Sequence, residues 1–408
     1  MSFSPVDKEN GTKKASISNI STKPYTSAAA GHQGISTDPT GAMLIKPCTQ
    51  AEIDFYESAK DHPNFQAHMP TYMGQLRVGD ANLQTQASIL QAQQADEPNV
   101  QSPVSAIPRT STFGTPGRST TGHGHRRNES GHIVSDPRIA RSANKEWTPS
   151  GGAKLSSNLS IVLSNATAGF RKPNVIDLKL GARLWDDDEP EPKRKKLDEV
   201  SANSTSGSLG FRVAGMKVFV GDAEVSKEVN TDVHDGYKTY SKFYGRDTIT
   251  QDNITSAFEN FLWSLDHLVD DSDVTALRKA LLRRKMLLQR LLREVESIEY
   301  VLETEESRMY SASILMVYEG DPAALETVVS YKEEDDKLVD VEAIEEEDEE
   351  DDEGDVLPGQ KIHEVVLIDF AHAHWTPGQG PDENALKGVR SIKSILERLI
   401  VEVNGKLR

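Results

Sequence analysis

The sequence contains one cysteine, Cys48, among its 408 residues. A single cysteine excludes an internal disulfide and fits a reducing compartment. No apolar run reaches the ~18 residues that a membrane-spanning helix needs, so we expect no transmembrane segment. The first ten residues, MSFSPVDKEN, have no apolar core, and we expect no secretory signal there.

Two motifs of nucleotide-dependent enzymes are missing as well. The sequence holds no G-x-x-x-x-G-K-[ST] phosphate-binding loop and no H-R-D catalytic loop. A P-loop enzyme and a standard protein kinase are therefore poor fits to this chain.

The chain is also poor in hydrophobic residues, which make up 36% of it, while 27% of its residues are charged. This composition is polar for a compact protein of this length and indicates a globular part diluted by disordered insertions. The net charge is −18, but acid is concentrated in residues 333–355, so the charge does not exclude an anionic ligand. At ~100–200 residues per domain, one two-lobed domain with tails fits the length.

Segments with the pattern of ordered structure alternate with polar ones. We expect a disordered tail over residues 1–26, a disordered insertion over 84–150 and an acidic disordered insertion over 333–356. Strand-like runs lie at residues 42–47, 160–163, 173–181, 209–221, 311–320 and 364–372. Helical periodicity lies at residues 254–268, 274–302 and 382–403. Residues 49–52, Thr-Gln-Ala-Glu, have the form of a capping box, which predicts a further helix start.

The segment 274–302 is long and amphipathic, with Arg and Lys residues on its polar side. By itself this pattern is compatible with a coiled coil or a calmodulin target. Because a strand follows at once, we interpret it as a long helix of a larger lobe.

One stretch, residues 173–181 (PNVIDLKLG), organises the rest of the sequence. At strand period its apolar residues share the face that can meet a core: Ile176, Leu178 and Leu180. Asp177 and Lys179 fall on the other face. An acid and a base side by side suit a phosphate site, because the ammonium neutralises phosphoryl charge and the carboxylate holds a hydroxyl. A strand with a surface ion pair is the alternative, and in either case we expect Lys179 to be exposed.

Three charged features follow one another along the predicted strands. Lys46 lies on an early strand, the Asp177/Lys179 pair on a middle one, and Asp369 at the end of a late one. A nucleotide-dependent phosphotransferase needs such groups, because a lysine neutralises the nucleotide phosphates and a late aspartate holds Mg²⁺.

Several motifs make the sequence resemble the inositol polyphosphate kinase family. The family signature P-x-x-x-D-x-K-x-G is matched in full by residues 173–181. The family's Ser-Leu-Leu segment is matched, with one change, by residues 313–315, and its I-D-F-A-H segment by residues 368–372. Residues 31–34, 210–219 and 244–246 also look similar, so the resemblance covers nearly all of the sequence expected to be ordered.

The resemblance implies an α+β, two-lobed fold related to protein kinases, with disordered insertions. Residues 27–172 would form the smaller, ATP-binding lobe, and residues 173–408 the larger catalytic and substrate lobe. ATP would lie in the cleft, with an inositol phosphate on the larger lobe.

The resemblance also implies roles for single residues. Lys179 would be catalytic at the transferred phosphoryl group, and Asp369 would be catalytic as the Mg²⁺ ligand. Lys46 would contact the nucleotide phosphates and Asp177 the ribose hydroxyls. Further nucleotide contacts are expected from Leu163, Asn165 and Leu315.

A substrate with several phosphates needs several cations. The family's substrate segment follows the signature, where residues 193–196 read Lys-Arg-Lys-Lys. The expected substrate contacts are Lys179, Lys193, Lys196, Lys217, Lys242 and His372. Lys193 and Lys196 would share one face of a helix that starts near Pro190 and Pro192. The same cluster also has the composition of a nuclear localisation signal, and the two roles are compatible.

Within the family, the short polar segment between Gly181 and Leu209 and the two insertions look most like a fungal inositol polyphosphate multikinase. Such an enzyme would convert inositol trisphosphate to the tetrakis- and pentakisphosphate with ATP and Mg²⁺. An inositol hexakisphosphate kinase is the alternative inside the family.

A hypothesis from another class is a nuclear scaffold or transcription cofactor whose kinase activity is secondary. Its basic, acidic and disordered segments would suit protein partners. A pure scaffold would not need Lys46, Asp177, Lys179 and Asp369 together. We therefore expect inositol polyphosphates as partners, with phosphoinositide lipid headgroups and nuclear proteins as further ones. We expect no direct nucleic-acid binding and a location in nucleus and cytoplasm.

Overall fold

The structure is a computed structural model that describes residues 22–29, 34–77, 157–267, 273–327 and 361–408. These residues all belong to one compact unit, which does not include Val78–Thr148. The predicted insertions at 84–150 and 333–356 lie outside the described residues, and their disorder stays a prediction.

The first sheet has five antiparallel strands in the order β1-β2-β3-β5-β4. The strands are β1 (Lys23–Pro24), β2 (Ser36–Thr37), β3 (Met43–Pro47), β4 (Tyr72–Arg77) and β5 (Leu159–Ser164). Since β1 and the residues after it are placed, the prediction of a disordered tail as far as residue 26 is wrong at its end.

Three short helical elements follow β3: α1 (Gln50–Ser58), η1 (Ala59–Asp61) and α2 (Pro63–Gln66). Thr49 is the N-cap of α1, where its hydroxyl accepts the backbone N–H of Glu52 at 3.2 Å. This is one half of the predicted capping box.

The second sheet has six antiparallel strands in the order β12-β11-β6-β7-β9-β8. The strands are β6 (Pro173–Leu180), β7 (Phe211–Phe219), β8 (Thr231–His234), β9 (Tyr237–Tyr240), β11 (Ser313–Glu319) and β12 (His363–Ile368). A separate pair joins β10 (Ser307–Met309) to β13 (Ala373–Trp375).

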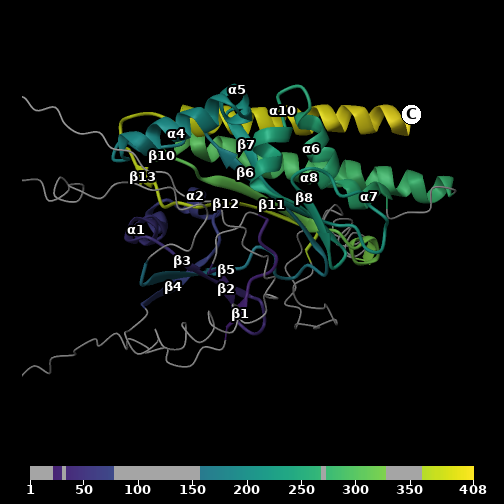
Figure 1. Ribbon diagram of the computed structural model, residues 1–408, viewed down its shortest axis with the longest axis horizontal. Helices are drawn as coiled ribbons and strands as arrows, with labels where there is room; N and C mark the ends of the chain where they lie inside the picture. The colour runs from purple at the N-terminus through teal and green to yellow at the C-terminus, as the bar shows by residue number, and fades with distance from the viewer. Residues whose placement is uncertain (1–21, 30–33, 78–156, 268–272, 328–360) are drawn as a thin grey trace, which may run out of the picture. The chain divides into compact units, whose positions relative to one another are not determined.

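Helices pack on this sheet, and the two longest, α8 and α10, lie side by side (Figure 1). The helices are α4 (Glu191–Ala202), α5 (Thr205–Leu209), a π-helical turn (Tyr244–Thr248), α6 (Ile254–Phe261), α7 (Trp263–His267), α8 (Val274–Thr304) and α10 (Glu383–Leu407). The interpretation of segment 274–302 as a helix of the larger lobe is confirmed, because α8 buries Leu287, Leu291 and Val295 against the core. None of the described helices is both long and apolar enough to cross a membrane.

Strand β6 is central in the six-stranded sheet, between β11 and β7. Ile176, Leu178 and Leu180 are fully buried in the core, as the alternation predicted. A β-bulge interrupts the pairing of β6 with β7, where Asp177 faces Gly215 but Leu178 faces Val213. The extra residue in β7 changes which of its side chains share the face of Asp177 and Lys179.

Candidate functional site

A cavity lies between the two sheets, and residues from both line it. The five-stranded sheet contributes β3 and β5, and the six-stranded sheet contributes β6, β11 and β12. All five residues predicted to contact a nucleotide line this one cavity: Lys46, Leu163, Asn165, Asp177 and Leu315. Asp369 lines it as well. The structure thus brings together residues more than 300 positions apart in the sequence.

Lys46 is held by two carboxylates. Its ammonium is 2.9 Å from Glu52 Oε1 and forms a second ion pair with Asp369 Oδ1. Burial alone would lower the pKa of Lys46, but Asp369 and Glu52 outweigh it and raise the pKa above its usual value. Lys46 therefore keeps its charge inside the cavity.

Glu52 was not predicted as a site residue. It is the third residue of α1, and its carboxylate, which a capping box would turn back to the helix start, instead reaches Lys46. The sequence did contain a signal for this contact, because Glu52 stands six residues after Lys46, at the start of a predicted helix. Only the fold shows that strand β3 and helix α1 face each other at this point.

Asp369 directly follows β12, and its backbone has a φ of +68°. A non-glycine residue in this left-handed region is strained, and such strain needs support from the surroundings. The neighbouring Phe370 supplies it, because its fully buried ring stacks on Phe55 of α1 with ring centroids 4.9 Å apart. The Asp369 carboxylate is thereby fixed between the two sheets.

Asp177 and Lys179 share one face of β6, as predicted. Lys179 is not an exposed lysine, which corrects the expectation from sequence. Its ammonium donates to the Ser311 carbonyl at 2.6 Å, and desolvation lowers its pKa against the opposing effect of Asp369 and Asp177. The side chain is half-buried on a strand that lies between β7 and β11.

Two arginines were missed by the sequence analysis: Arg212, which lies near Lys179, and Arg246, which lies near Arg212. Arg212 of β7 lies opposite Lys179, is 4% exposed, and donates to Ser206 Oγ at 2.9 Å. Desolvation, followed by repulsion from Arg246, lowers the pKa of Arg212 to about 10, while Asp177 opposes this shift. Both arginines stand in segments similar to the family. Simple alternation could not place Arg212, because the bulge in β7 shifts the facing residues.

Gly181 ends the signature with a φ of +93°. A Cβ there would come within 2.6 Å of the Asn384 amide nitrogen, so only glycine fits without a shift. The Asn384 side-chain oxygen accepts the backbone N–H groups of Ala182 and Arg183 at 2.9 and 2.8 Å. Helix α10 thus fixes the path of the chain as it leaves Lys179.

The basic cluster lies on α4, which begins between the two prolines as predicted. Lys193 forms an ion pair with Glu189, whose carboxylate also lies 3.4 Å from His372 Nε2. Burial lowers the pKa of His372, with Glu189 acting against this. The structure therefore brings Lys193 and His372 to one place. Lys196 lies one turn further along α4 and is exposed.

The two remaining predicted substrate residues lie elsewhere. The Lys217 ammonium donates to the Thr26 carbonyl at 2.7 Å and lies 4.4 Å from the centre of the Tyr237 ring. Lys217 pairs with Val175, which lies four residues before Lys179 on β6. Its hydrogen bond to Thr26 connects it to the N-terminal segment. The Lys242 ammonium lies 5.5 Å from the ring of the exposed Phe243. Their assignment as substrate contacts stays a prediction.

The N-terminal segment contributes to the cavity in a way that the sequence did not predict. Tyr25, Ser27 and Ala28 line it, and the Tyr25 hydroxyl lies 3.1 Å from Thr167 Oγ1. Asn165 lines the cavity but uses its side chain within the protein. Its amide donates to the Gly41 carbonyl at 2.7 Å, and its oxygen accepts from Thr167. A ligand here would meet the backbone and apolar atoms of this segment.

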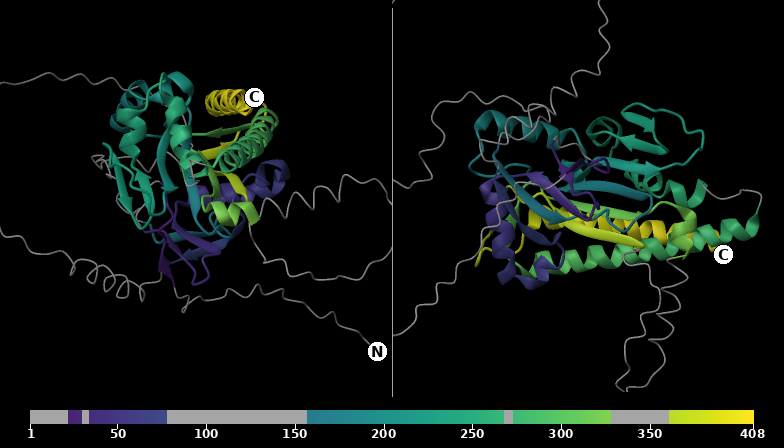
Figure 2. Two further views of the ribbon diagram at one scale, coloured as in Figure 1. Left: turned by 90° about the vertical axis from the view of Figure 1, so that its right-hand side faces the viewer. Right: turned by 90° about the horizontal axis from the view of Figure 1, so that it is seen from below.

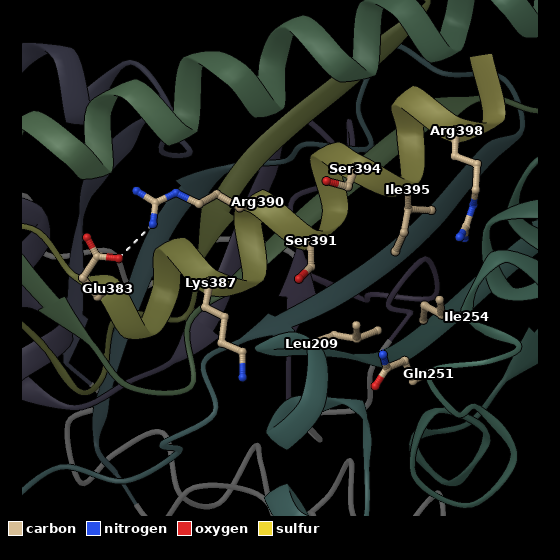
Figure 3. Close-up of a pocket in the computed structure, with 10 residues that line it drawn as sticks. All are labelled: Leu209, Gln251, Ile254, Glu383, Lys387, Arg390, Ser391, Ser394, Ile395 and Arg398. Atoms are coloured by element: carbon tan, nitrogen blue, oxygen red, sulfur yellow. Dashed lines mark hydrogen bonds and ion pairs between the residues drawn. The ribbon is translucent and has the colours of Figure 1, made fainter. Parts of the chain in front are cut away.

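A second hollow runs along α10, bordered by α5 and the start of α6 (Figure 3). Its lining includes Lys387, Arg390 and Arg398, but Arg390 is paired with the carboxylates of Glu299, Glu303 and Glu383. None of the residues predicted for catalysis or nucleotide binding lines this groove. The chemistry therefore belongs to the cavity between the sheets.

Asp177 and Asp369 both line the cavity, and Asp369 is the one predicted to hold a divalent cation. In the part of the chain that the structure describes, no group of three or more His, Cys, Asp or Glu side chains forms a complete metal cage. Mg²⁺ in phosphotransferases is held by one or two carboxylates together with substrate phosphates and water. The donor set thus fits a metal that enters with a phosphate ligand.

The two facing sheets and the cavity between them form a two-lobed fold of the kinase type, and the sequence comparisons make the protein a phosphotransferase. The sequence profile described as "Inositol polyphosphate kinase" matches residues 160–397. The chain belongs to the inositol polyphosphate kinase family. The resemblance and the α+β, two-lobed fold class predicted from the sequence are both confirmed.

Comparisons with individual proteins agree. The chain is 30% identical to the inositol polyphosphate multikinase of Saccharomyces cerevisiae, over 90% of this chain and 95% of the relative. It is 23% identical to the inositol polyphosphate multikinase of Schizosaccharomyces pombe, over 89% of this chain and 92% of the relative. Inositol hexakisphosphate kinase 3 of Mus musculus is 27% identical over 58% of this chain and 50% of its own length. A crystal structure of the S. cerevisiae inositol phosphate multikinase in complex with ADP and Mn²⁺ has a TM-score of 0.53 at 24% identity, covering 88% of this chain and 100% of that one.

Proposed function

We propose that this protein is an ATP-dependent kinase that phosphorylates inositol polyphosphates, converting inositol trisphosphate to the tetrakis- and pentakisphosphate. The observation that carries the proposal is the meeting of Lys46, Asp177 and Asp369 around one cavity between the sheets, with Lys179 two residues after Asp177 on the same face of β6. Family membership supplies the substrate class. The full-length similarity to multikinases, against half-length similarity to hexakisphosphate kinases, supports the multikinase type.

The buried cations would perform most of the chemistry. Phosphoryl transfer depends on positioning and on neutralising the charge of the transferring group, so ammonium groups in a desolvated cavity act strongly. Lys46, held in place by Glu52, would bind the nucleotide phosphates. Lys179, fixed by the Ser311 carbonyl, would bind the transferring phosphoryl group. Asp177 would hold the ribose hydroxyls.

Asp369 would bind the divalent cation. Mg²⁺ held there together with ATP would neutralise charge on the β- and γ-phosphate oxygens. The left-handed backbone at Asp369 and the buried Phe370 ring keep the carboxylate at the end of β12. In the absence of such a ligand, Lys46 neutralises this carboxylate.

The substrate would lie between Lys179 and α4. Arg212 opposite Lys179, and Lys193 beside His372, are cations on two sides of this position. Glu189 now pairs with Lys193, and a substrate phosphate would compete with that carboxylate for the ammonium. Several cations around one position suit a ligand that carries several phosphates.

The direct test is incubation of the purified protein with ATP, Mg²⁺ and single inositol phosphates, with the products separated by chromatography. We expect inositol trisphosphate to yield tetrakis- and pentakisphosphate. In separate reactions, inositol hexakisphosphate or phosphoinositide lipids replace inositol trisphosphate as the substrate. Turnover of the hexakisphosphate alone would favour the hexakisphosphate kinase, and no transfer to any inositol phosphate would contradict the proposal.

We also propose that the protein occurs in the nucleus as well as the cytoplasm. The support is the basic run 193–196, of which Lys195 and Lys196 are exposed on α4. A fluorescent fusion in which the four residues are replaced by alanine tests this proposal. Unchanged nuclear signal would contradict it.

A further inference from the structure

The outward face of α8 carries charges that the kinase site does not use. Between Val274 and Arg293 this helix has no acidic residue, and it has seven cations, of which Arg284 is buried: Arg278, Lys279, Arg283, Arg284, Lys285, Arg290 and Arg293. The rest of α8, residues 294–304, has four acidic residues and no cation: Glu294, Glu296, Glu299 and Glu303. Charge is therefore separated along one helix.

This separation does not favour the helix itself. Like charges three or four residues apart repel, as in the pairs Lys279/Arg283 and Arg290/Arg293, and the first pair shares the carboxylate of Glu326, outside the helix, at 3.8 and 3.6 Å. Helices gain stability when acids and bases alternate at this spacing. An arrangement that works against local stability points to a role beyond folding.

Six residues form a stripe on the outward side of this half of α8, spaced three or four apart, all exposed except the half-buried Lys285: Val274, Arg278, Leu282, Lys285, Gln289 and Arg293. We call them the basic stripe. Two of its members are apolar, with Val274 79% exposed and Leu282 47% exposed. The face on the other side of the helix packs into the core through Leu287, Leu291 and Val295.

The cations of the stripe are not neutralised by the described protein. Arg278 donates to a neutral acceptor, the Leu407 carbonyl, at 3.4 Å. Among the residues that the structure describes, no carboxylate lies in ion-pair contact with Arg278, Lys285 or Arg293. The stripe thus presents positive charge to solvent although the whole chain carries −18.

The end of α10 continues this surface. The contact of Arg278 with Leu407 places the start of α8 beside the C-terminus, and Figure 2 shows the two helices reaching the same end of the sheet. Lys406, Arg408 and the exposed Val401 lie on this part of α10, together with the exposed Glu402. Both helices therefore add cations interleaved with exposed aliphatic side chains.

We propose that the basic stripe binds the surface of an anionic lipid bilayer. Cations on a helix attract anionic headgroups, and aliphatic side chains between them enter the boundary of the acyl region. Nucleic acid would use the cations but gives exposed Leu and Val side chains no partner. A calmodulin-type partner would need the apolar face of the helix, which is buried in the core here. Because β12 and α10 pack on other sides of α8, the bound bilayer leaves the cavity between the sheets free.

The test uses the full chain and phosphatidylcholine vesicles with or without phosphatidylserine, in a sedimentation assay. The wild-type protein should bind only the vesicles that contain phosphatidylserine, and salt should weaken this binding. The triple variant Arg278→Gln/Lys285→Gln/Arg293→Gln should bind them roughly a hundredfold more weakly. The reason is that each cation near the membrane surface contributes about 1 kcal/mol to binding. The double variant Val274→Ser/Leu282→Ser should also bind more weakly.

A matched control is the triple variant Lys60→Gln/Lys227→Gln/Lys361→Gln, which changes the net charge equally but at surface positions outside the stripe. It should bind as the wild type does. Turnover of soluble inositol trisphosphate and the melting temperature show that all variants are folded. Equal loss in the control, retained binding in the stripe variant, or no preference of the wild type for phosphatidylserine overturns the proposal. Binding of duplex DNA, lost in the stripe variant while vesicles are not bound, would replace the bilayer with nucleic acid.

Discussion

Two groups of charges serve the proposed kinase in different ways. The first is the largely buried cluster of Lys46, Asp177, Lys179 and Asp369 between the sheets, carried by β3, β6 and the end of β12. The second is the basic run 193–196 on α4, where Lys195 is paired with Glu191 at the surface. In the buried cluster, desolvation strengthens every electrostatic interaction and the protein fixes each side chain. On α4, water and salt screen the charges.

The two groups should therefore affect different kinetic constants. Charges fixed in a desolvated cavity can stabilise a transition state, so their loss should lower kcat. Screened charges on a surface helix bind ground state and transition state alike, so their loss should raise KM. Five experiments test this contrast, beginning with the largest expected effect.

Lys179→Met should reduce kcat by roughly a thousandfold or more, because the transferring phosphoryl group loses its ammonium. The melting temperature should be no lower than that of the wild type. Desolvation lowers the pKa of Lys179, so the folded protein disfavours the charged lysine at neutral pH, and removing it does not cost stability. Kinetics and calorimetry on the same preparation check both parts. Wild-type turnover in the folded variant would remove Lys179 from the mechanism.

Asp369→Asn should reduce kcat by about a hundredfold to a thousandfold, because a neutral amide binds a divalent cation poorly. The Mg²⁺ concentration for half-maximal rate should rise as well. A titration of rate against Mg²⁺ measures both changes. Unchanged activity at limiting Mg²⁺ would show that another group binds the cation.

Glu52→Gln should reduce kcat/KM for ATP by about tenfold, because Lys46 loses one of its two carboxylates and becomes less well positioned. The free energy of unfolding should fall by about 1–3 kcal/mol, the usual cost of a lost charge-assisted hydrogen bond. Replacing Glu52 should therefore lower the stability of the fold, whereas replacing Lys179 should not. A variant with wild-type stability and wild-type ATP dependence would leave Glu52 without a role in the site.

Replacement of residues 193–196 by alanine should raise KM for the inositol phosphate and leave kcat close to wild type. Two lost phosphate contacts at ~1–3 kcal/mol each would raise KM by at least about tenfold. The increase should be smaller at high salt, where the wild-type contacts are already screened. We expect Lys193 to account for most of it, since it lies beside His372. An unchanged KM would leave the cluster with its localisation role only.

Deletion of residues 84–150 should have the smallest effect. These residues lie outside the described structure, and their polar composition predicts that they bury no core. Long surface insertions cost little to close, so activity and melting temperature should stay near wild type. Loss of folded protein would show that this segment is a domain.

The sequence predicted the site best where a motif lies on one regular element. Residues 173–181 form a strand with the predicted faces, and the residues predicted for the nucleotide line one cavity. Period-2 alternation fixes which side chains share a face when the strand is regular. The family resemblance supplied the order of these segments along the fold.

The sequence could not predict contacts that depend on irregular or long-range geometry. Arg212 reaches the face of Lys179 because a β-bulge shifts β7, and a bulge leaves no clear sign in the alternation pattern. Glu52 meets Lys46 through the packing of α1 on β3. Lys179 is half-buried on a strand between β7 and β11, which come from residues far along the chain.

The most direct test of the central claim follows the γ-phosphate of ATP. Radiolabelled ATP, Mg²⁺ and inositol trisphosphate are incubated with the wild-type protein or with folded Lys179→Met, and the labelled products are separated over time. We predict that the wild type transfers label first to the tetrakisphosphate and then to the pentakisphosphate, while the variant transfers almost none. Label that stays in ATP or appears only as free phosphate with the wild type, or equal transfer by the variant, would contradict the account.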